Sequence, residues 1–325
     1  MRTEVITTAR TIKLMKPNKL SRMRADIFLY LLLLPAILSV LVFKYIPIPG
    51  LIIAFKDYSL IDATNALTAM FTSKWVGLQN IREVFTTAGM VTAIFNTLKL
   101  SLITLALSFP IPVTLAVLFT ELKVGIFKKI AQTVSYLPHF LSVVSIIGIV
   151  ITFYGLYGPI NDLRVAMLGE GVNGSNRILF LSQPGFFIPN VVIITIWKEA
   201  GWGSILYLAN IAGIDPQLYE AARMDGAGRF RQVLNITLPS LIPTIVITLI
   251  LSIGSIFSFS FDLVFGLQNA FVRYETIDTL VYKMGILSGN YSLAAALGFT
   301  RGIVAFILTV IVNYFSKKAT DVGLF

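Results

Sequence analysis

Long apolar runs alternate with shorter polar segments along most of the chain. A helix needs about 20 residues to cross a bilayer, and six runs reach that length. They cover about 27–48, 94–119, 134–154, 187–211, 240–261 and 293–315. Polar tails at 1–26 and 316–325 flank the first and last runs. The pattern predicts an all-α integral membrane protein with about six transmembrane helices and a membrane domain over 27–315.

The fourth run is ambiguous because Lys198 and Glu199 interrupt it. It is either one span with both charges near mid-depth or two short spans divided at Lys198. The distribution of basic residues favours one span. The four segments 1–26, 120–133, 212–239 and 316–325 carry 15 Lys and Arg, whereas the other three loops carry 7. Because Lys and Arg accumulate in cytoplasmic loops, both termini and the 212–239 loop are expected in the cytoplasm, and a second break would scramble this bias.

Composition agrees with this assignment. The 325 residues are 56% hydrophobic and only 13% charged, whereas soluble domains contain about 25% charged residues. The chain has no Cys, which excludes disulfides and thiolate metal sites. The net charge of +10 has two explanations, basic cytoplasmic loops or a positive path for an anionic substrate. Nucleic-acid binding is not expected, because no soluble domain is present to offer a basic face.

The 212–239 loop predicts two short helices before the fifth span. Asp215 suits an N-cap and Pro216 the first helical position. Gly226 can adopt a positive φ and end the first helix. A second helix, roughly Arg229 to Thr237, leads to Pro239 at the entrance of the span. From these residues alone the loop is either an amphipathic helix lying on lipid or a docking element for a cytoplasmic partner.

The same residues carry a family resemblance. Glu220-Ala221-Ala222, then Gly226 after three residues, Ile236 after nine more and Leu238-Pro239 resemble the EAA loop of membrane subunits of binding-protein-dependent ABC importers. The segment "WKEAGWGSILYLANIAGIDPQLYEAARMDGA" is similar to the sugar-importer branch. "FKYIPIPGLIIAFKDYSL" and "YSLAAALGFTRGI" resemble polysaccharide permeases, including alginate importer subunits. The resemblance extends over nearly the whole chain.

The resemblance implies a coupling helix that docks into a groove on an ATP-hydrolysing subunit. Glu220 would contact the ATPase, Ala221 and Ala222 would permit close packing, and Gly226 would set the bend. Asp225, Ile236, Leu238 and Pro239 complete the expected coupling motif.

The resemblance also implies the partners: a second permease subunit, two ATPase subunits, an extracytoplasmic solute-binding protein, a saccharide substrate and membrane lipid. The expected location is the bacterial cytoplasmic (inner) membrane. The chain contains no phosphate-binding loop of the form G-x-x-x-x-G-K-[ST]. ATP and Mg are therefore expected on the partner ATPase, and this chain is expected to be a transport subunit, not an enzyme, with no cofactor or metal of its own.

Buried polar residues are candidates for the substrate path. Lys198, Glu199 and Arg301 lie inside predicted spans, where charges are costly and face a cavity or a partner. Adjacent helical residues point about 100° apart, so Lys198 and Glu199 are not expected to face one direction. Each charge either joins neighbouring helices or lines the path. Lys198 and Arg301 on the path would favour a carboxylate-bearing sugar.

Aromatic and amide residues of the fourth span have the same two interpretations. Trp202, Tyr207 and Asn210, together with Trp197, could line a saccharide path or could pack helices. His139 is expected to be structural. Other functions remain open: a neutral oligosaccharide importer of the same class, an ion-coupled secondary transporter, for which Asp262 is the only membrane carboxylate in a suitable place, and a membrane scaffold without transport.

Overall fold

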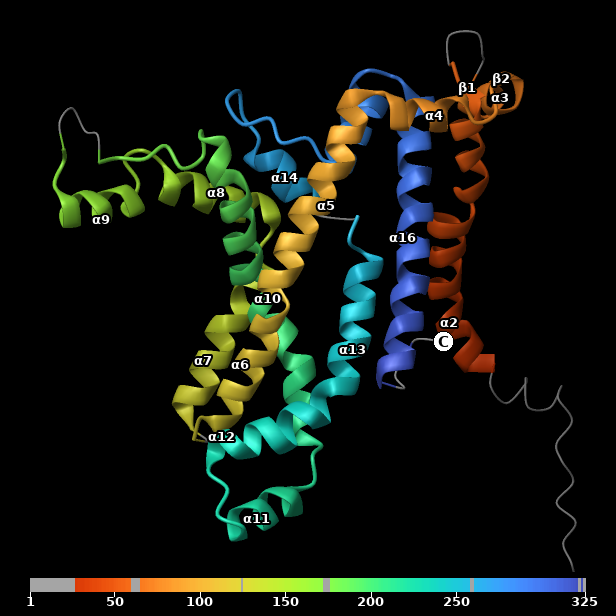
Figure 1. Cartoon of the computed structure of the whole chain (residues 1–325). Coiled ribbons are helices and arrows are strands. Elements are labelled where there is room, and N and C mark those ends of the chain that lie inside the picture. Colours follow the sequence, from red (N-terminus) through yellow and green to blue (C-terminus); the bar gives the residue numbers. More distant parts are fainter. Residues whose placement is uncertain are drawn as a thin grey trace, which may run out of the picture. The chain divides into compact units, whose positions relative to one another are not determined.

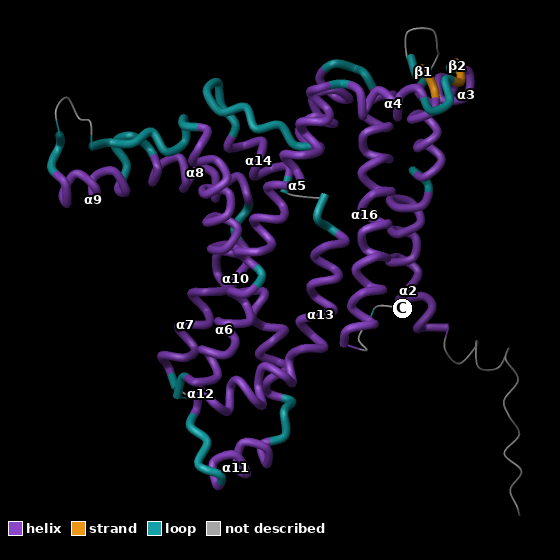
Figure 2. Tube along the Cα trace, in the orientation of Figure 1, coloured by secondary structure: helices purple, strands orange, loops and turns teal. Residues whose placement is uncertain are grey.

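The computed structural model describes residues 27–59, 65–123, 125–171, 176–257, 260–320 and 323. The predicted tail 1–26 lies outside them. Within the described residues, six helical segments are long and apolar enough to cross a membrane, as predicted: Ile27–Phe55, Ala88–Glu121, Val143–Leu168, Pro184–Ala212, Arg229–Gly254 and Tyr291–Lys318. Helices dominate the trace (Figures 1 and 2).

The chain divides into two units, residues 1–52 and 53–325. The first contains α2 (Ile27–Val40), followed by the π-turn η1 (Leu41–Tyr45) and the start of the 3-10 segment η2 (Ile48–Phe55). All residues of α2 are aliphatic or aromatic, apart from Pro35 and Ser39. This composition suits a helix that has an apolar medium on all sides.

The second unit begins with a small cap that the sequence predicted only as a long polar loop. Strands β1 (Lys56–Asp57) and β2 (Lys74–Trp75) pair antiparallel, with Lys56 opposite Trp75. Helices α3 (Ala66–Thr72) and α4 (Gln79–Thr86) complete the cap. The buried Lys56 donates from Nζ to the carbonyl oxygens of Met70 and Phe71, at 2.8 and 2.9 Å, which ties β1 to the end of α3.

The next segments show where proline divides the predicted spans. Helix α5 (Ala88–Ser108) passes into α6 (Pro110–Glu121) at Phe109, because proline cannot donate a helical hydrogen bond. The predicted span 134–154 is not one continuous helix. Its first residues belong to α7 (Ile126–Tyr136), a 3-10 turn η3 (Leu137–Phe140) containing Pro138 interrupts it, and α8 (Val143–Tyr154) follows. The short α9 (Pro159–Leu168) follows and completes the candidate spanning segment Val143–Leu168.

The fourth span is one unbroken helix, as predicted. After the turn η5 (Pro184–Phe186), α10 runs from Phe187 to Ala212 through Lys198 and Glu199. Helix α11 (Pro216–Met224) follows. Next, α12 (Arg229–Gln232), the π-turn η6 (Val233–Thr237) and α13 (Leu238–Gly254) form one helical segment. The fifth span therefore begins earlier than the predicted 240–261, and its helix ends at Gly254.

The C-terminal part begins with two short helices, α14 (Phe261–Leu267) and α15 (Ile277–Tyr282). The π-turn η7 (Lys283–Leu287) then leads to the long helix α16 (Tyr291–Thr320). Thr276 caps α15 in a capping box with Thr279. Backbone contact with α5 comes from Ile277, whose N–H donates to the Thr97 hydroxyl at 2.8 Å.

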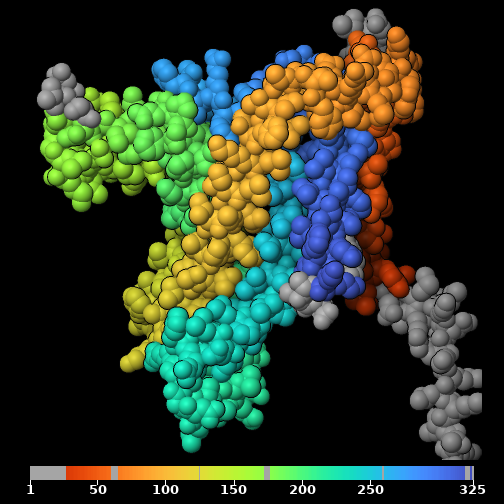
Figure 3. Space-filling model, viewed as in Figure 1, coloured from red at the N-terminus to blue at the C-terminus, as the bar shows by residue number. Residues whose placement is uncertain are grey.

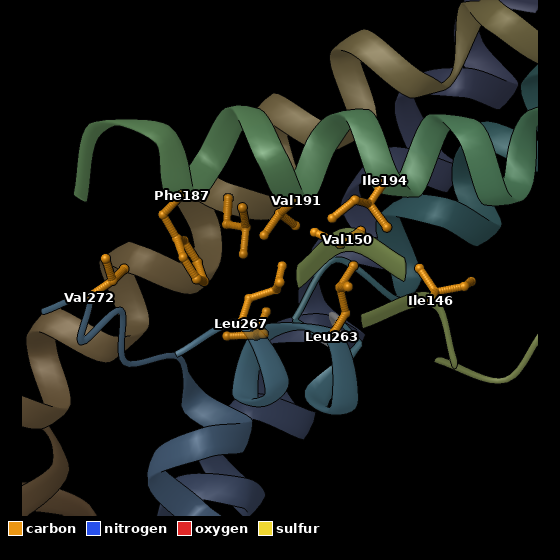
Figure 4. Packing of buried hydrophobic residues seen from close by; sticks show 10 residues of the cluster. Ile146, Val150, Phe187, Val191, Ile194, Leu263, Leu267 and Val272 are labelled. Atoms are coloured by element: carbon orange, nitrogen blue, oxygen red, sulfur yellow. The ribbon is translucent and has the colours of Figure 1, made fainter. Parts of the chain in front are cut away.

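Three apolar clusters hold the second unit together. One joins α5, α8, α10 and α14 through Leu100, Ile146, Val150, Phe187, Val191, Ile194, Leu263, Val264 and Leu267, with Val272 (Figure 4). A second joins α4, α5, α15 and α16 around Val84, Ile277 and Leu297. The third joins α6, α10 and α13 through Ala116, Tyr207, Ile211 and Leu241. Helix α10 contributes to two clusters, so it is central to the packing of this unit.

Glycine permits an unusually close approach between α10 and α7. A Cβ atom added at Gly201 would lie 1.9 Å from the backbone oxygen of Ser135. Only a residue without a side chain fits there. This contact places the end of α7 and the adjoining η3 against the middle of α10, where the two predicted charges lie.

Candidate transport cavity and coupling loop

A cavity of about 600 Å³ lies between α5, α8, α10, α13 and α14. Its apolar wall contains Leu105, Val143, Ile146, Ile194, Ile256 and Leu263. Its polar groups are one pair of charges, Lys198 and Glu199, and the hydroxyls of Ser101, Thr104, Ser108, Thr195, Ser252, Ser255 and Ser260. An apolar pocket with convergent polar groups is the usual form of a small-molecule site.

Two of these hydroxyls have no hydrogen-bond partner among the described residues. Ser101 is 5% exposed and Thr104 is 4% exposed, yet Ser101 Oγ and Thr104 Oγ1 are unpaired. Most other hydroxyls on helix interiors here bond to a carbonyl of the preceding turn, as Ser252 Oγ does with the Thr248 oxygen at 2.8 Å. Buried polar groups are nearly always paired, so these two oxygens, which are closed off from solvent in this conformation, carry an uncompensated desolvation cost.

Lys198 and Glu199 both border the cavity and bond to each other. Lys198 Nζ lies 2.7 Å from Glu199 Oε1 and 3.3 Å from the carbonyl oxygen of His139. The expectation that these neighbours cannot face one direction is wrong. The 100° angle applies to the Cα–Cβ bonds, and both side chains are long enough to converge beyond them.

His139 completes a three-residue cluster with this pair. Its Nδ1 lies 2.8 Å from Glu199 Oε2. Its ring stacks on Trp202, with centroids 4.6 Å apart and an interplanar angle of 2°. His139 therefore fixes η3 on α10, and it is also a direct neighbour of the cavity charges.

A second pocket of about 380 Å³ adjoins the cavity and shares Leu105, Ser108, Thr195, Glu199 and Ser252 with it. The predicted residues Trp202 and Tyr207 line this second pocket. The Tyr207 hydroxyl also pairs with Thr248 Oγ1 at 2.8 Å. The pairing joins α10 to α13, so Tyr207 serves helix packing while it faces the pocket.

Two predicted path residues lie elsewhere. Asn210 Nδ2 donates to Thr244 Oγ1 at 2.5 Å and lines neither pocket. Arg301 on α16 forms an ion pair with Asp278 on α15 and lines neither pocket. Burial raises the pKa of the Asp278 carboxyl above its ordinary value, and the Arg301 charge offsets part of that rise. The structure therefore gives Asn210 and Arg301 helix-joining contacts and does not bring them to Lys198.

The 212–239 loop, which contains α11 and α12, projects from one end of the second unit (Figures 1 and 3). Asp215 accepts a hydrogen bond from the Gln217 N–H at 2.9 Å, and Pro216 occupies the first turn, as predicted. Gly226 has φ +77°, the left-handed conformation predicted from the sequence. Met224 is 89% exposed and Phe230 is 77% exposed, so the loop offers two uncovered apolar side chains.

The motif residues divide between an outer and an inner side of this loop. Glu220, Ala221, Asp225, Gly226 and Pro239 are exposed, and Ala222, Ile236 and Leu238 are half-buried. Two bonds hold the loop in place. The Tyr219 hydroxyl pairs with Thr237 Oγ1 at 2.9 Å, and Gln232 Nε2 donates to the Ala227 oxygen at 2.7 Å. The outer residues are thus presented on a fixed support.

The hydroxyl groups of the cavity were not among the candidate residues predicted from the sequence. A signal was available, because Ser101, Thr104 and Ser108 recur at the spacing of one helical face. Ser252 and Ser255 do the same on the segment that faces α5 across the cavity. A stripe of hydroxyls inside an apolar span indicates a polar cavity or an interhelical contact.

Comparisons with known proteins give concordant results. Residues 85–321 match the family described as "Binding-protein-dependent transport system inner membrane component". Protein LplB of Bacillus subtilis (strain 168) is 40% identical over 309 residues, which cover 94% of this chain and 93% of that protein. The polygalacturonan/rhamnogalacturonan transport system permease protein YteP of the same organism is 41% identical over 303 residues, covering 92% and 90%.

A solved structure is similar over nearly its full length. It is the crystal structure of a bacterial alginate ABC transporter in complex with an alginate pentasaccharide-bound periplasmic protein. One chain of it has a TM-score of 0.81 and 34% identity to this chain, and the match covers 95% of this chain and 100% of that one.

Proposed function

Because the chain belongs to the inner membrane components of binding-protein-dependent transport systems, as a multi-pass permease subunit of a sugar ABC importer, we propose that it imports acidic oligosaccharides. The observation that carries the substrate class is Lys198, a cation on the wall of a hydroxyl-lined cavity between the spans. Two similar proteins support the proposal, since one is named for polygalacturonan and the other carries alginate. Both are polymers of uronic acids.

The cavity matches the chemistry of a uronic acid chain. Each sugar ring offers hydroxyls that can donate and accept, and the cavity lining includes the hydroxyl residues Ser252, Ser255 and Ser260. A carboxylate on the ring would bond the Lys198 ammonium, since charge-assisted bonds are about twice as strong as neutral ones. Trp202 in the adjoining pocket supplies an aromatic face.

We further propose that α11 couples transport to ATP hydrolysis in two partner ATPase subunits, which bind ATP and Mg. The exposed Glu220 and Ala221 and the uncovered Met224 support a docking surface on α11. The two hydrogen bonds that hold the loop support a firm transfer of force. A second permease subunit and an extracytoplasmic solute-binding protein complete the importer.

The same proposal fixes the topology. The chain lies in the cytoplasmic (inner) membrane of a bacterium, with both termini and α11 in the cytoplasm. The excess of Lys and Arg on that side supports this orientation.

The substrate class is tested with the complete importer reconstituted in liposomes. Uptake of an oligogalacturonide is compared with uptake of its methyl ester, which has the same rings without the charge. Lys198→Met should lower acidic uptake about tenfold, the usual worth of one hydrogen bond to a charged group, and should lower ester uptake much less. Lys99→Met is the matched control, because Lys99 is an exposed cation of α5 that does not line the cavity. Equal losses for both saccharides would contradict the assignment.

A further inference from the structure

We propose that the Glu199 carboxylate binds the Lys198 ammonium at the position where the carboxylate of a uronate binds during transport. The two residues then form a carboxylate-exchange site. The inference rests on the proposed substrate class. It assigns the Lys198 ammonium as the exchange point and Glu199 as the resident ligand that the saccharide displaces.

The bonds of Lys198 set up the exchange. Its ammonium has three N–H donors, of which one reaches Glu199 Oε1 at 2.7 Å and another the His139 carbonyl at 3.3 Å. The side chain of Lys198 is 18% exposed, which limits the approach of water to the ammonium. An arriving carboxylate can therefore replace Glu199 oxygen for oxygen, while the His139 carbonyl keeps the ammonium in place.

Glu199 has a second contact, with His139, so it can break its bond to Lys198 and still stay in the site. Its other oxygen, Oε2, lies 2.8 Å from His139 Nδ1, and His139 is itself held by stacking on Trp202. Glu199 is 44% exposed and borders both the cavity and the adjoining pocket. Its carboxylate can rotate toward the adjoining pocket while Oε2 stays with His139.

A cation that is paired with a displaceable carboxylate suits a transport site better than an unpaired cation does. An unpaired ammonium inside a membrane protein is costly and would hold a carboxylate tightly. With Glu199 present, the ammonium is paired both before and after the saccharide arrives, so one charge-assisted bond replaces another. The net gain on binding is then small, and the saccharide can leave again. Glu199 thus limits the affinity for acidic saccharides.

The test measures equilibrium binding to the purified assembly of both permease subunits and the ATPase subunits, without the binding protein. The probes are trigalacturonate and its trimethyl ester. Glu199→Gln removes the competing charge, so trigalacturonate should bind about tenfold more tightly, the worth of one hydrogen bond to a charged group. The ester should change less than twofold, and the maximal uptake rate of the acidic sugar should fall because release becomes slower.

Two further variants keep the test decisive. Lys198→Met/Glu199→Gln removes both charges and should lose the gain in affinity. Glu199→Asp keeps a carboxylate but shortens its reach, so trigalacturonate binding should tighten about threefold even if the Gln variant fails to assemble. Unchanged or weaker binding of trigalacturonate by these single variants, or equal changes for acid and ester, would overturn the exchange. If the wild-type importer instead imports no oligogalacturonide, the proposed substrate class fails, whatever the Glu199 variants do.

Discussion

The close contact at Gly201 should be the most demanding packing site in the chain. Replacing Gly201 with Ala would place a Cβ 1.9 Å from the Ser135 oxygen, and real Cβ contacts are no shorter than 3.0 Å. The opposing atom is backbone, so α7 must move away from α10 by more than 1 Å. That shift would also lengthen the 2.8 Å contact between His139 and Glu199, because His139 lies one turn beyond Ser135.

The expected change in the free energy of unfolding of Gly201→Ala has two opposing contributions. Forcing an extra carbon into a packed contact costs about 1–3 kcal/mol, and a rigid backbone opponent places this case at the upper end. Ala is a better helix former than Gly by about 1 kcal/mol. The net loss is about 2 kcal/mol, or about 3 °C in apparent Tm for a chain of 325 residues.

The measurement is the apparent Tm of the detergent-purified importer at a fixed scan rate, with uptake as a second readout. Gly298→Ala in α16 is the matched control, since a Cβ there meets nothing within 4 Å and should raise the Tm slightly. Gly201→Ala should also lose uptake, because the charged cluster is displaced. Equal Tm values for the two variants would refute the packing argument.

Three further outcomes follow from the structure. Arg301→Met should lower the free energy of unfolding by about 1–2 kcal/mol, because the half-buried Asp278 loses its partner. Arg301→Met/Asp278→Asn should recover part of that loss. A changed ratio of acidic to ester uptake would instead place Arg301 on the path. Glu220→Lys should abolish uptake while the chain still inserts, measured as transport against membrane-fraction yield; normal uptake would remove Glu220 from the coupling contact. Met224→Cys, at 89% exposure in a chain without Cys, should react with impermeant thiol reagents only from the cytoplasm and be protected by the ATPase, and labelling from outside would invert the topology.

Local signals in the sequence predicted local structure well. Asp215, Pro216 and Gly226 act through bonds and dihedral angles within a few residues, and each has the predicted role in the structure. The number of spans was also predictable, because length and hydropathy alone decide which segments can cross a membrane.

The cavity was less predictable, because its groups meet through contacts distant in sequence. Arg301 was indistinguishable from Lys198 as a charge in an apolar run, and only the fold shows that Asp278, 23 residues earlier, is its partner. The link between His139 and Glu199 spans 60 residues. The break at η3 was missed because the hydropathy of 134–154 is continuous across Pro138.

The π-turn η6 has a mechanical consequence. There the Leu238 N–H donates to the Val233 oxygen, five residues back, so the helix absorbs an extra residue ahead of Pro239 and stays unbroken from Arg229 to Gly254. The 24 residues from Arg229 to Ser252 make a lever arm of about 35 Å, and a tilt of about 5° at its base moves the far end by about 3 Å. That distance equals the length of a hydrogen bond, and Ser252 lies on the wall of the cavity. A small rotation at the Arg229 end of this helix is therefore enough to reshape the cavity wall at Ser252.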